Sequence, residues 1–338
     1  MIQLTKQIVY LSLICVLFNI QSYSQTDKKY VHRYDTLLII RVFLSQKYTS
    51  LIFRNLQDQS SYRFRPNPKL NLGMGGTFGP LTLNLGYGFG FINPDDTDVK
   101  GNTKGFDLQA NLYFRKFIID LIAQSYKGLY STDKVYRDAT GKNYLRPDME
   151  ARQFGVNGQY VLNHKRFSYR ASLFNSDWQK KSAGSLLVGA EIFGGLQKAD
   201  SSLIPNRTPL FENHSQSLNF FQLGPNLGYA YTLVIHKRFY LTGSLASSLV
   251  YQFNTLKEEA ETSKSSGFSS NTFFRAFAGY NGTKWAGGIS WIHSNMNIAS
   301  STELRTDLKS GKASISAVYR LNTPTSKLKK QLPDALQF

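Results

Sequence analysis

The feature that most constrains this chain is the strict alternation of large apolar residues with small or polar ones in residues 81–91. The apolar positions begin at Leu81, Leu83 and Leu85, and the positions between them carry Thr, Asn and Gly. Successive side chains of a β-strand point to opposite faces, so one face of this strand requires an apolar environment and the other requires close polar packing. This pattern is typical of the wall of a transmembrane β-barrel, whose outer face contacts lipid.

The same alternation recurs in segments of about ten residues, the length at which a tilted strand crosses a bilayer. The clearest segments are 106–114, 154–162, 239–246 and 313–321. With 42–54 as the first crossing and 313–321 as the last, the sequence predicts an all-β, antiparallel transmembrane barrel of about twelve strands, with fourteen as the alternative.

One segment does not fit this count. Residues 182–196 also alternate, yet including them gives an odd number of strands, whereas bacterial single-chain barrels have even numbers. We therefore expect this segment to fold into the lumen, or a partner strand to lie within 200–213.

The connections between strands are of two kinds. The short turns, basic or rich in glycine, are 78–80, 115–116, 163–166, 236–238 and 281–284, and apolar-aromatic strands are expected to follow those at 163–166 and 236–238. The long polar connections are 93–104, 128–150, 254–270 and 297–309. In such barrels short turns face the periplasm and long loops face outward.

The first residues predict export. Lys6 precedes an apolar run, and small residues precede Gln25, as in a secretory signal peptide. The expected divisions are a signal peptide at 1–24, a periplasmic N-terminal segment at 25–36, an outer-membrane barrel at 37–322 and a C-terminal tail at 323–338. The single cysteine, Cys15, lies inside the signal, so no disulfide or thiolate chemistry is expected in the mature chain.

The net charge of +18 suggests anionic partners. Export makes nucleic acid an unsuitable partner, whereas outer-membrane lipid, lipopolysaccharide and small anionic solutes fit. The barrel assembly machinery is a further expected partner, and residues 319–321 supply the expected assembly signal at the end of the last strand.

Several strings extend beyond generic alternation, namely 44–49, 65–67, 83–94, 120–128, 178–185 and 224–229. In these strings the chain resembles a group of Bacteroidota outer-membrane β-barrel proteins that is classed as a domain of unknown function. The resemblance spans nearly the whole mature chain and implies an outer-membrane barrel. It implies no activity, ligand or catalytic residue.

Charged residues at inward positions are the main site candidates. They are Asp107, Asp120, Arg170, Glu191, Arg275 and Arg320. Charges inside a narrow barrel must pair or stay hydrated, which favours a structural network of carboxylates and guanidinium groups. The alternative is a path along which unpaired arginines attract anions.

A catalytic alternative involves His293 and Ser294. The string around them resembles the His-x-Ser-Asn of outer-membrane lipid A deacylases, but adjacent strand positions point to opposite faces unless a bulge intervenes. Asp95, Asp96 and Asp98 lack the spacing of an EF-hand calcium loop. No metal or cofactor is expected.

The sequence thus predicts a non-enzymatic outer-membrane barrel, either a narrow pore or a structural and interaction protein. The alternatives are a lipid-modifying hydrolase using His293, and a surface adhesin or receptor using the long loops.

Overall fold

The computed structural model describes residues 26–34, 37–57, 59–78, 81–204, 215–258, 261–300 and 304–321. The expected signal peptide, the C-terminal tail, the tip of the 78–80 turn and most of 200–213 lie outside these residues. Within them, no helix is long and apolar enough to cross a membrane.

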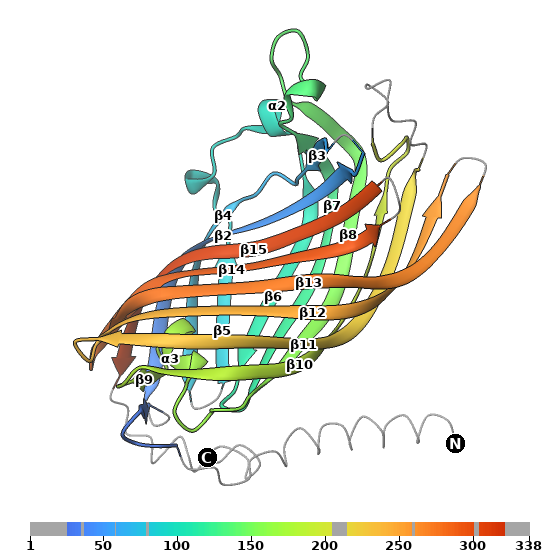
Figure 1. Cartoon of the computed structure of the whole chain (residues 1–338). Coiled ribbons are helices and arrows are strands. Elements are labelled where there is room, and N and C mark those ends of the chain that lie inside the picture. Colours follow the sequence, from blue (N-terminus) through green and yellow to red (C-terminus); the bar gives the residue numbers. More distant parts are fainter. Residues whose placement is uncertain are drawn as a thin grey trace, which may run out of the picture.

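Twelve antiparallel strands form a nearly closed, tilted barrel (Figure 1), as the alternation predicts. The wall consists of β2 (Leu38–Asn55), β4 (Leu70–Phe78), β5 (Leu81–Tyr87), β6 (Lys104–Tyr113), β7 (Phe117–Ser131), β8 (Tyr144–Val161), β10 (Ala183–Lys198), β11 (Ser217–Ile235), β12 (Phe239–Lys257), β13 (Thr262–Asn281), β14 (Trp285–Ser300) and β15 (Leu304–Leu321). The remaining elements are β1 (Val31–Arg33), β3 (Ser61–Phe64), β9 (Asp177–Gln179), α2 (Thr97–Lys100), α3 (Tyr169–Leu173) and two 3₁₀ turns, η1 (Gly90–Ile92) and η2 (Lys134–Tyr136).

Neighbouring strands pair in sequence order except where β15 meets β2, which joins the two ends of the chain. The sheet order therefore ends in β5 on one side and β6 on the other. Among the described residues β5 pairs with β4 and β6 pairs with β7, and no ladder joins β5 to β6. We call this break in the wall the seam.

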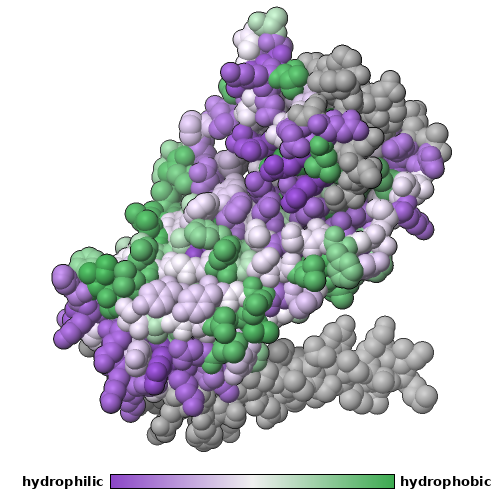
Figure 2. Space-filling view, in the orientation of Figure 1, coloured by the Kyte–Doolittle hydropathy of each residue, from purple (hydrophilic) through white to green (hydrophobic). Residues whose placement is uncertain are grey.

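The outer surface has the pattern of a membrane barrel. Apolar and pale side chains cover the middle of the wall, and hydrophilic ones gather toward both ends (Figure 2). Exposed aromatic pairs flank this band, with Phe239 against Tyr280 on one side and Tyr251 against Phe268 on the other. Phe239 and Tyr251 are twelve positions apart on β12. At about 3.3 Å per residue and a tilt of about 45°, this corresponds to ~28 Å of membrane thickness, close to the height of a hydrocarbon core.

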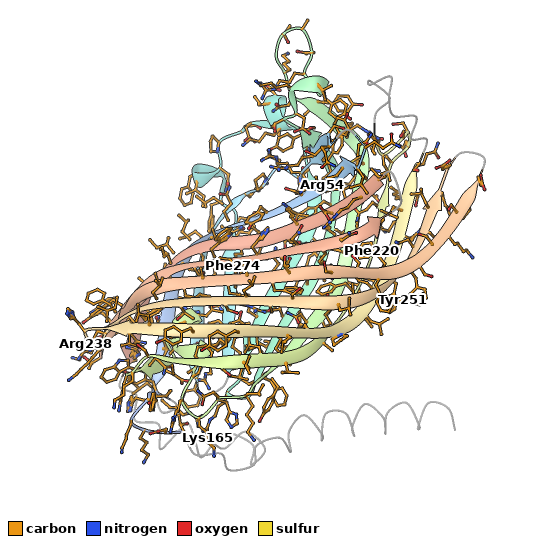
Figure 3. All side chains as sticks on the ribbon, in the orientation of Figure 1. Arg54, Lys165, Phe220, Arg238, Tyr251 and Phe274 are labelled. Carbon is orange, nitrogen blue, oxygen red and sulfur yellow. The ribbon has the colours of Figure 1, made fainter. Side chains whose placement is uncertain are left out.

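The short turns lie at the end of the barrel where Lys165 and Arg238 project (Figure 3), and we assign this end to the periplasm. The prediction of long loops at 254–270 and 297–309 is wrong. Most of 254–270 and 297–309 belongs to paired strands, which leaves only short connections between β12 and β13 and between β14 and β15. These strands continue beyond the apolar band, where both faces of a strand can be polar, so their lack of apolar residues did not indicate an end of pairing.

The segment 182–196 is a wall strand, β10, paired on both sides with β8 and β11. Our expectation that it lies in the lumen or needs a hidden partner strand is therefore wrong. The strand number stays even because the segment after the turn at 163–166 leaves the wall. Residues 167–173 alternate like a strand, but Ser168 accepts a hydrogen bond from the Ala171 backbone and begins the short helix α3.

Candidate functional site

The interior of the barrel contains a polar belt between two apolar clusters. Along the strands the inward order is Met149, Gln153, Asn157, Gln159 and Val161 on β8, Leu187, Glu191 and Phe193 on β10, and Phe273, Arg275 and Phe277 on β13. One end of each strand carries an apolar residue of the cluster in the extracellular half of the lumen, namely Met149, Phe193 or Phe273. The other end carries a residue of the cluster in the periplasmic half, namely Val161, Leu187 or Phe277, and polar residues lie between them. The belt contains most of the charged candidates.

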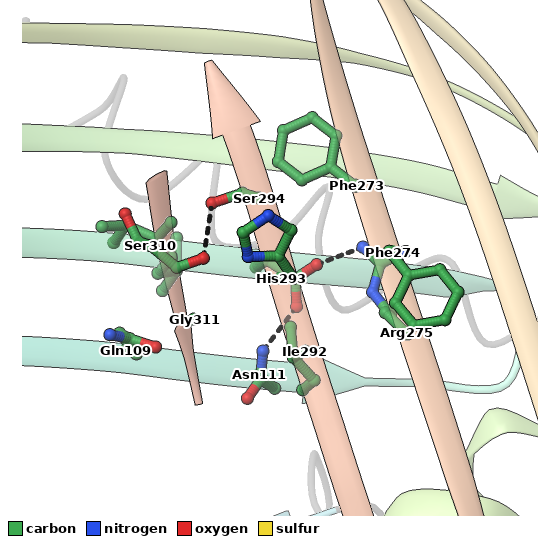
Figure 4. A pocket seen from close by; sticks show the side chains of 13 residues that line it. Gln109, Asn111, Phe273, Phe274, Arg275, Ile292, His293, Ser294, Ser310 and Gly311 are labelled. Atoms are coloured by element: carbon green, nitrogen blue, oxygen red, sulfur yellow. Dashed lines mark hydrogen bonds and ion pairs between the residues drawn. The ribbon is translucent and has the colours of Figure 1, made fainter. Parts of the chain in front are cut away.

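Asp120 and Arg275 form the central ion pair of the belt. The Arg275 guanidinium donates to the Asp120 carboxylate, and Arg275 is 1% exposed. Asn111 donates to the other oxygen of Asp120 at 2.6 Å. Figure 4 shows Asn111 and Arg275 at a cavity of about 30 Å³, which Asp120 also lines and which has enough room for one or two water molecules.

Asp107 lies on the same face of β6. Its carboxylate accepts a hydrogen bond from the Tyr126 hydroxyl at 2.5 Å and lies 3.5 Å from the Lys47 ammonium. Lys47 also donates to the backbone carbonyl of Asp107 at 2.6 Å. Lys47 therefore links β2 to an edge strand of the sheet.

Glu191 is held by neutral partners. Ser248 donates to one carboxylate oxygen at 2.6 Å and Asn271 to the other at 2.5 Å. Asn226 on β11 lies opposite Gly189, the inward position of β10 next to Glu191, and its side chain donates to the Asn157 side chain at 2.7 Å. These two groups of hydrogen bonds connect β10 to β12 and β13, and β11 to β8.

Arg170 and Arg320 lie at the periplasmic end. Arg170 belongs to α3, where its Nε donates to Ser176 at 3.3 Å and lies 3.9 Å from Asp177. The interpretation of Arg170 as a residue of a wall strand is therefore wrong. Arg320 donates to the Asn175 carbonyl at 2.7 Å and contacts the face of the Tyr34 ring.

Together these contacts hold residues 166–181 inside the periplasmic mouth, and we call this segment the plug. Arg41 donates to the Phe174 carbonyl, the Tyr240 hydroxyl donates to the Ser172 carbonyl at 3.0 Å, and β9 pairs with β1. Tyr169 and Phe174 join the periplasmic apolar cluster. The plug is thus secured by hydrogen bonds to the wall and by burial of aromatic rings.

The extracellular half of the lumen is filled in a different way. Inward side chains of nine wall strands meet those of β3, η2 and the residues after β10 in one apolar cluster, whose largest members are Phe53, Tyr62, Phe64, Tyr136, Phe193, Phe220 and Phe273. Burial of each large apolar side chain contributes roughly 1.5–3 kcal/mol. An open passage through this half would require separating most of these contacts.

His293 and Ser294 point to opposite faces of β14. His293 Nδ1 lies 2.9 Å from the Tyr48 hydroxyl on the outer surface, and that hydroxyl also accepts from the Trp291 indole at 2.8 Å. Ser294 is buried and donates to the Ser310 carbonyl at 3.3 Å (Figure 4). The geometry therefore does not bring the imidazole to the serine hydroxyl. Nor, within the described residues, do three His, Cys, Asp or Glu side chains gather as metal ligands.

Two functional candidates were missed at the level of sequence. Lys47 and Lys312 stand directly opposite each other on β2 and β15, both facing inward. Lys312 donates to the Asn111 side chain at 3.1 Å, and no carboxylate of the described residues lies within ion-pair distance of it. The alternation of residues 313–321 could have placed Lys312 inward. Its proximity to Lys47 depends on the closure of the barrel.

The strand order, the apolar outer band, the aromatic pairs at its edges and the polar interior define an outer-membrane β-barrel protein. The chain belongs to the family described as Domain of unknown function (DUF4421), whose model matches residues 25–321. The resemblance to a domain-of-unknown-function group of outer-membrane barrels is thereby confirmed, and the Bacteroidota origin stays a prediction. No curated protein matches this sequence.

Solved outer-membrane barrels are similar at low level. The outer membrane protease OmpT from Escherichia coli has 10% identity and a TM-score of 0.40, covering 89% of this chain and 99% of that one. The toluene transporter TodX of P. putida has 7% identity and a TM-score of 0.28, covering 85% and 91%. OprG from Pseudomonas aeruginosa has 8% identity and a TM-score of 0.22, covering 86% and 98%. These scores are too low to support an argument about activity.

Proposed function

We propose that this protein is an outer-membrane barrel with a filled lumen that acts by binding at its surfaces, and that it does not work as a general diffusion pore. The observation that carries the proposal is the filling of the lumen at both ends. Each of the two fillings, the extracellular apolar cluster and the periplasmic plug, consists of buried side chains in contact with the wall.

The inward charges support the same view. An anion path needs arginines that are free to attract a passing solute. Arg275 is paired with Asp120, and Arg320 donates to backbone carbonyls and to the Asn281 side chain. Arg170 donates to the Ser176 hydroxyl within the plug. These groups stabilise the closed form.

The extracellular loops offer one binding surface. The residues between β5 and β6 are braced on the start of β4, since Asn93 exchanges hydrogen bonds with the Leu70 backbone and Asn67 donates to Asp96 at 2.6 Å. A braced loop presents a defined surface to a partner at lower entropic cost than a free one. This supports an interaction role.

Planar-bilayer recording of the purified full-length mature protein tests the proposal, with a general porin as the positive control. We expect no steady conductance at moderate voltage. The informative variant replaces residues 169–175 by a Gly-Ser linker of equal length; it should also stay silent, because the extracellular cluster remains. Steady, ion-selective conductance of the unmodified protein would show that the barrel is a pore.

A further inference from the structure

The seam leaves backbone groups of two strands without ladder partners. β5 and β6 each pair on one side, and no β5–β6 hydrogen bond is present among the described residues. In a bilayer an unsatisfied backbone N–H or C=O costs several kcal/mol, so membrane barrels normally close completely. An open edge at membrane depth therefore requires an occupant that supplies polar groups.

The lumen side of the seam carries excess positive charge. Lys47 and Lys312 are directly opposite on adjacent strands, an arrangement in which like charges repel. Asp107 lies 3.5 Å from Lys47, whereas Asp120 is occupied by Arg275. Lys312 is left with a neutral hydrogen-bond acceptor, and so is Arg41, which donates to Asn84 of β5 and to the Phe174 carbonyl. Among the described residues, the cations on this side of the seam therefore outnumber the carboxylates.

The membrane side of the seam is apolar on both strands. Leu83 and Leu85 on β5 are 67% and 69% exposed, and Phe106 and Leu108 on β6 are 60% and 45% exposed. These side chains alternate with the inward Asn84 on β5 and the inward Asp107 and Gln109 on β6. A molecule lying in the seam would therefore meet apolar side chains outside and polar ones inside.

Contacts of β6 and of the residues before it border the seam at its two ends. At the extracellular end the Asn67 backbone N–H donates to the Thr103 hydroxyl at 2.8 Å, and that hydroxyl donates to the Gly128 carbonyl at 2.6 Å. At the periplasmic end the Tyr113 ring of β6 packs against the Tyr169 ring of the plug, with 5.5 Å between the ring centroids. The gap thus faces sideways into the bilayer.

The wall next to the seam is lined with small residues on its inner face. Gly73 and Gly86 lie beneath the Phe43 ring, and a side chain at Gly73 would overlap that ring. Phe43 thus supplies an apolar surface on the inner face of β2, four residues from Lys47 on the same face, over which a chain bearing a charged head could pass from bilayer to lumen.

We propose that the seam is a lateral binding site for an anionic single-chain amphiphile of the membrane. Its carboxylate or phosphate head accepts hydrogen bonds from Lys47 and Lys312, and its chain lies against Leu83, Leu85, Phe106 and Leu108. The head also offers acceptors to unpaired backbone N–H groups of the seam. This inference does not depend on whether the barrel conducts ions.

Binding can be measured with spin-labelled stearate and the mature protein in phosphatidylcholine vesicles. We expect the electron spin resonance spectrum to contain an immobilised component that saturates with added label. Oleate or lysophosphatidate should displace this component, whereas oleyl alcohol, which has no charge, should not. The more effective of the two anions identifies the headgroup. Lys47→Gln and Lys312→Gln should each weaken binding about tenfold or more, since each removes a charge-assisted hydrogen bond.

Lys198→Gln is the matched control, because Lys198 lies at the extracellular end and pairs with Glu150. It should leave binding unchanged. Folding of each variant is verified by heat-modifiable migration and circular dichroism.

A second measurement keeps the native lysines. The expected mature chain has no cysteine, so Leu85→Cys at the seam and Leu245→Cys on β12, which are similarly exposed, can each carry a single bimane label. The spin label should quench the seam position saturably and the β12 position in proportion to its membrane concentration. Equal quenching at both positions, displacement by oleyl alcohol as effective as by oleate, or unchanged affinity in both lysine variants would overturn the proposal.

Discussion

The buried pair of Asp120 and Arg275 provides a quantitative test of the lumen as a structural network. Arg275→Met leaves the Asp120 carboxylate with one hydrogen bond from Asn111, and Asp120→Asn leaves a guanidinium that is 1% exposed without its counter-charge. Removing one partner of a buried pair typically costs 3–5 kcal/mol, because the other charge stays buried.

The two variants should differ in a defined order. Lys312 is bonded to Asn111 and can compensate part of the charge of Asp120 after Arg275 is lost. After Asp120 is lost, Arg275, Lys312 and Lys47 face each other with Asp107 as the remaining carboxylate. We therefore expect a loss in the free energy of unfolding of about 3 kcal/mol for Arg275→Met and about 5 kcal/mol for Asp120→Asn.

Urea unfolding in phosphatidylcholine vesicles, followed by tryptophan fluorescence, gives these values. The double variant should lose about 2 kcal/mol less than the sum of the single variants, which measures the coupling of the pair. The control is the exposed Arg152, whose guanidinium lies 2.9 Å from Glu150; Arg152→Met should cost about 0–1 kcal/mol, because Glu150 keeps Lys198 as a partner. Single-variant losses below about 1 kcal/mol at Asp120 and Arg275 would refute the view that this pair is a buried, structural contact.

Two further predictions concern the wall and the loop above the seam. Gly189→Ala should lower the free energy of unfolding by about 1–3 kcal/mol, because its new methyl group would overlap the Gly158 carbonyl and lie 2.8 Å from the Gln159 Cα. The control is Gly243→Ala, whose methyl group would meet nothing within 4 Å and which should be nearly neutral in the same assay. Equal effects of the two substitutions would contradict the packing argument. The hydrogen bond from Lys100, followed by that from Asn67, lowers the pKa of Asp96, and the hydrogen bond to Asp96 raises the pKa of Lys100. The contribution of Asp96 to the bracing of the loop is therefore present above the ordinary aspartate pKa of 3.8 and is lost as the pH falls below that value. Hydrogen exchange of residues 88–103, corrected for its intrinsic pH dependence, should rise below about pH 4 in the native chain, and Asp96→Asn should abolish that pH step; a step that persists in the variant would assign it to another group.

The wall of this barrel could be predicted from sequence because its signal is local. The alternation in 81–87 and 239–246 indicates which face of each strand meets lipid, and the structure places Leu83 and Leu241 on the outer surface accordingly. The expectation of a strand through residue 91 is wrong, because β5 ends at Tyr87 and the 3₁₀ turn η1 follows at Gly90–Ile92. The inward positions of Asp120 and Arg275 follow from the same period of two. Their pairing with each other does not, since they are 155 residues apart.

The plug could not be predicted, because its sequence is compatible with two structures. Residues 167–173 alternate as a strand would, and α3 forms instead because Arg41, Tyr240 and Arg320 supply hydrogen-bond partners to the plug from β2, β12 and β15. Those partners come together only once β15 has paired with β2. The same reason explains why 182–196 was misassigned, since one of the two segments had to leave the wall and the alternation favoured neither.

The sequence by itself determined that this chain forms a barrel wall with an apolar outside and a polar inside, since side-chain direction in a strand is a property of adjacent residues. Only the tertiary structure decided that the lumen is filled, that two lysines from opposite ends of the chain stand side by side, and that the sheet stops short of closing between β5 and β6. These features depend on strand length, register and the return of the last strand to the first, which are set by contacts across the whole barrel.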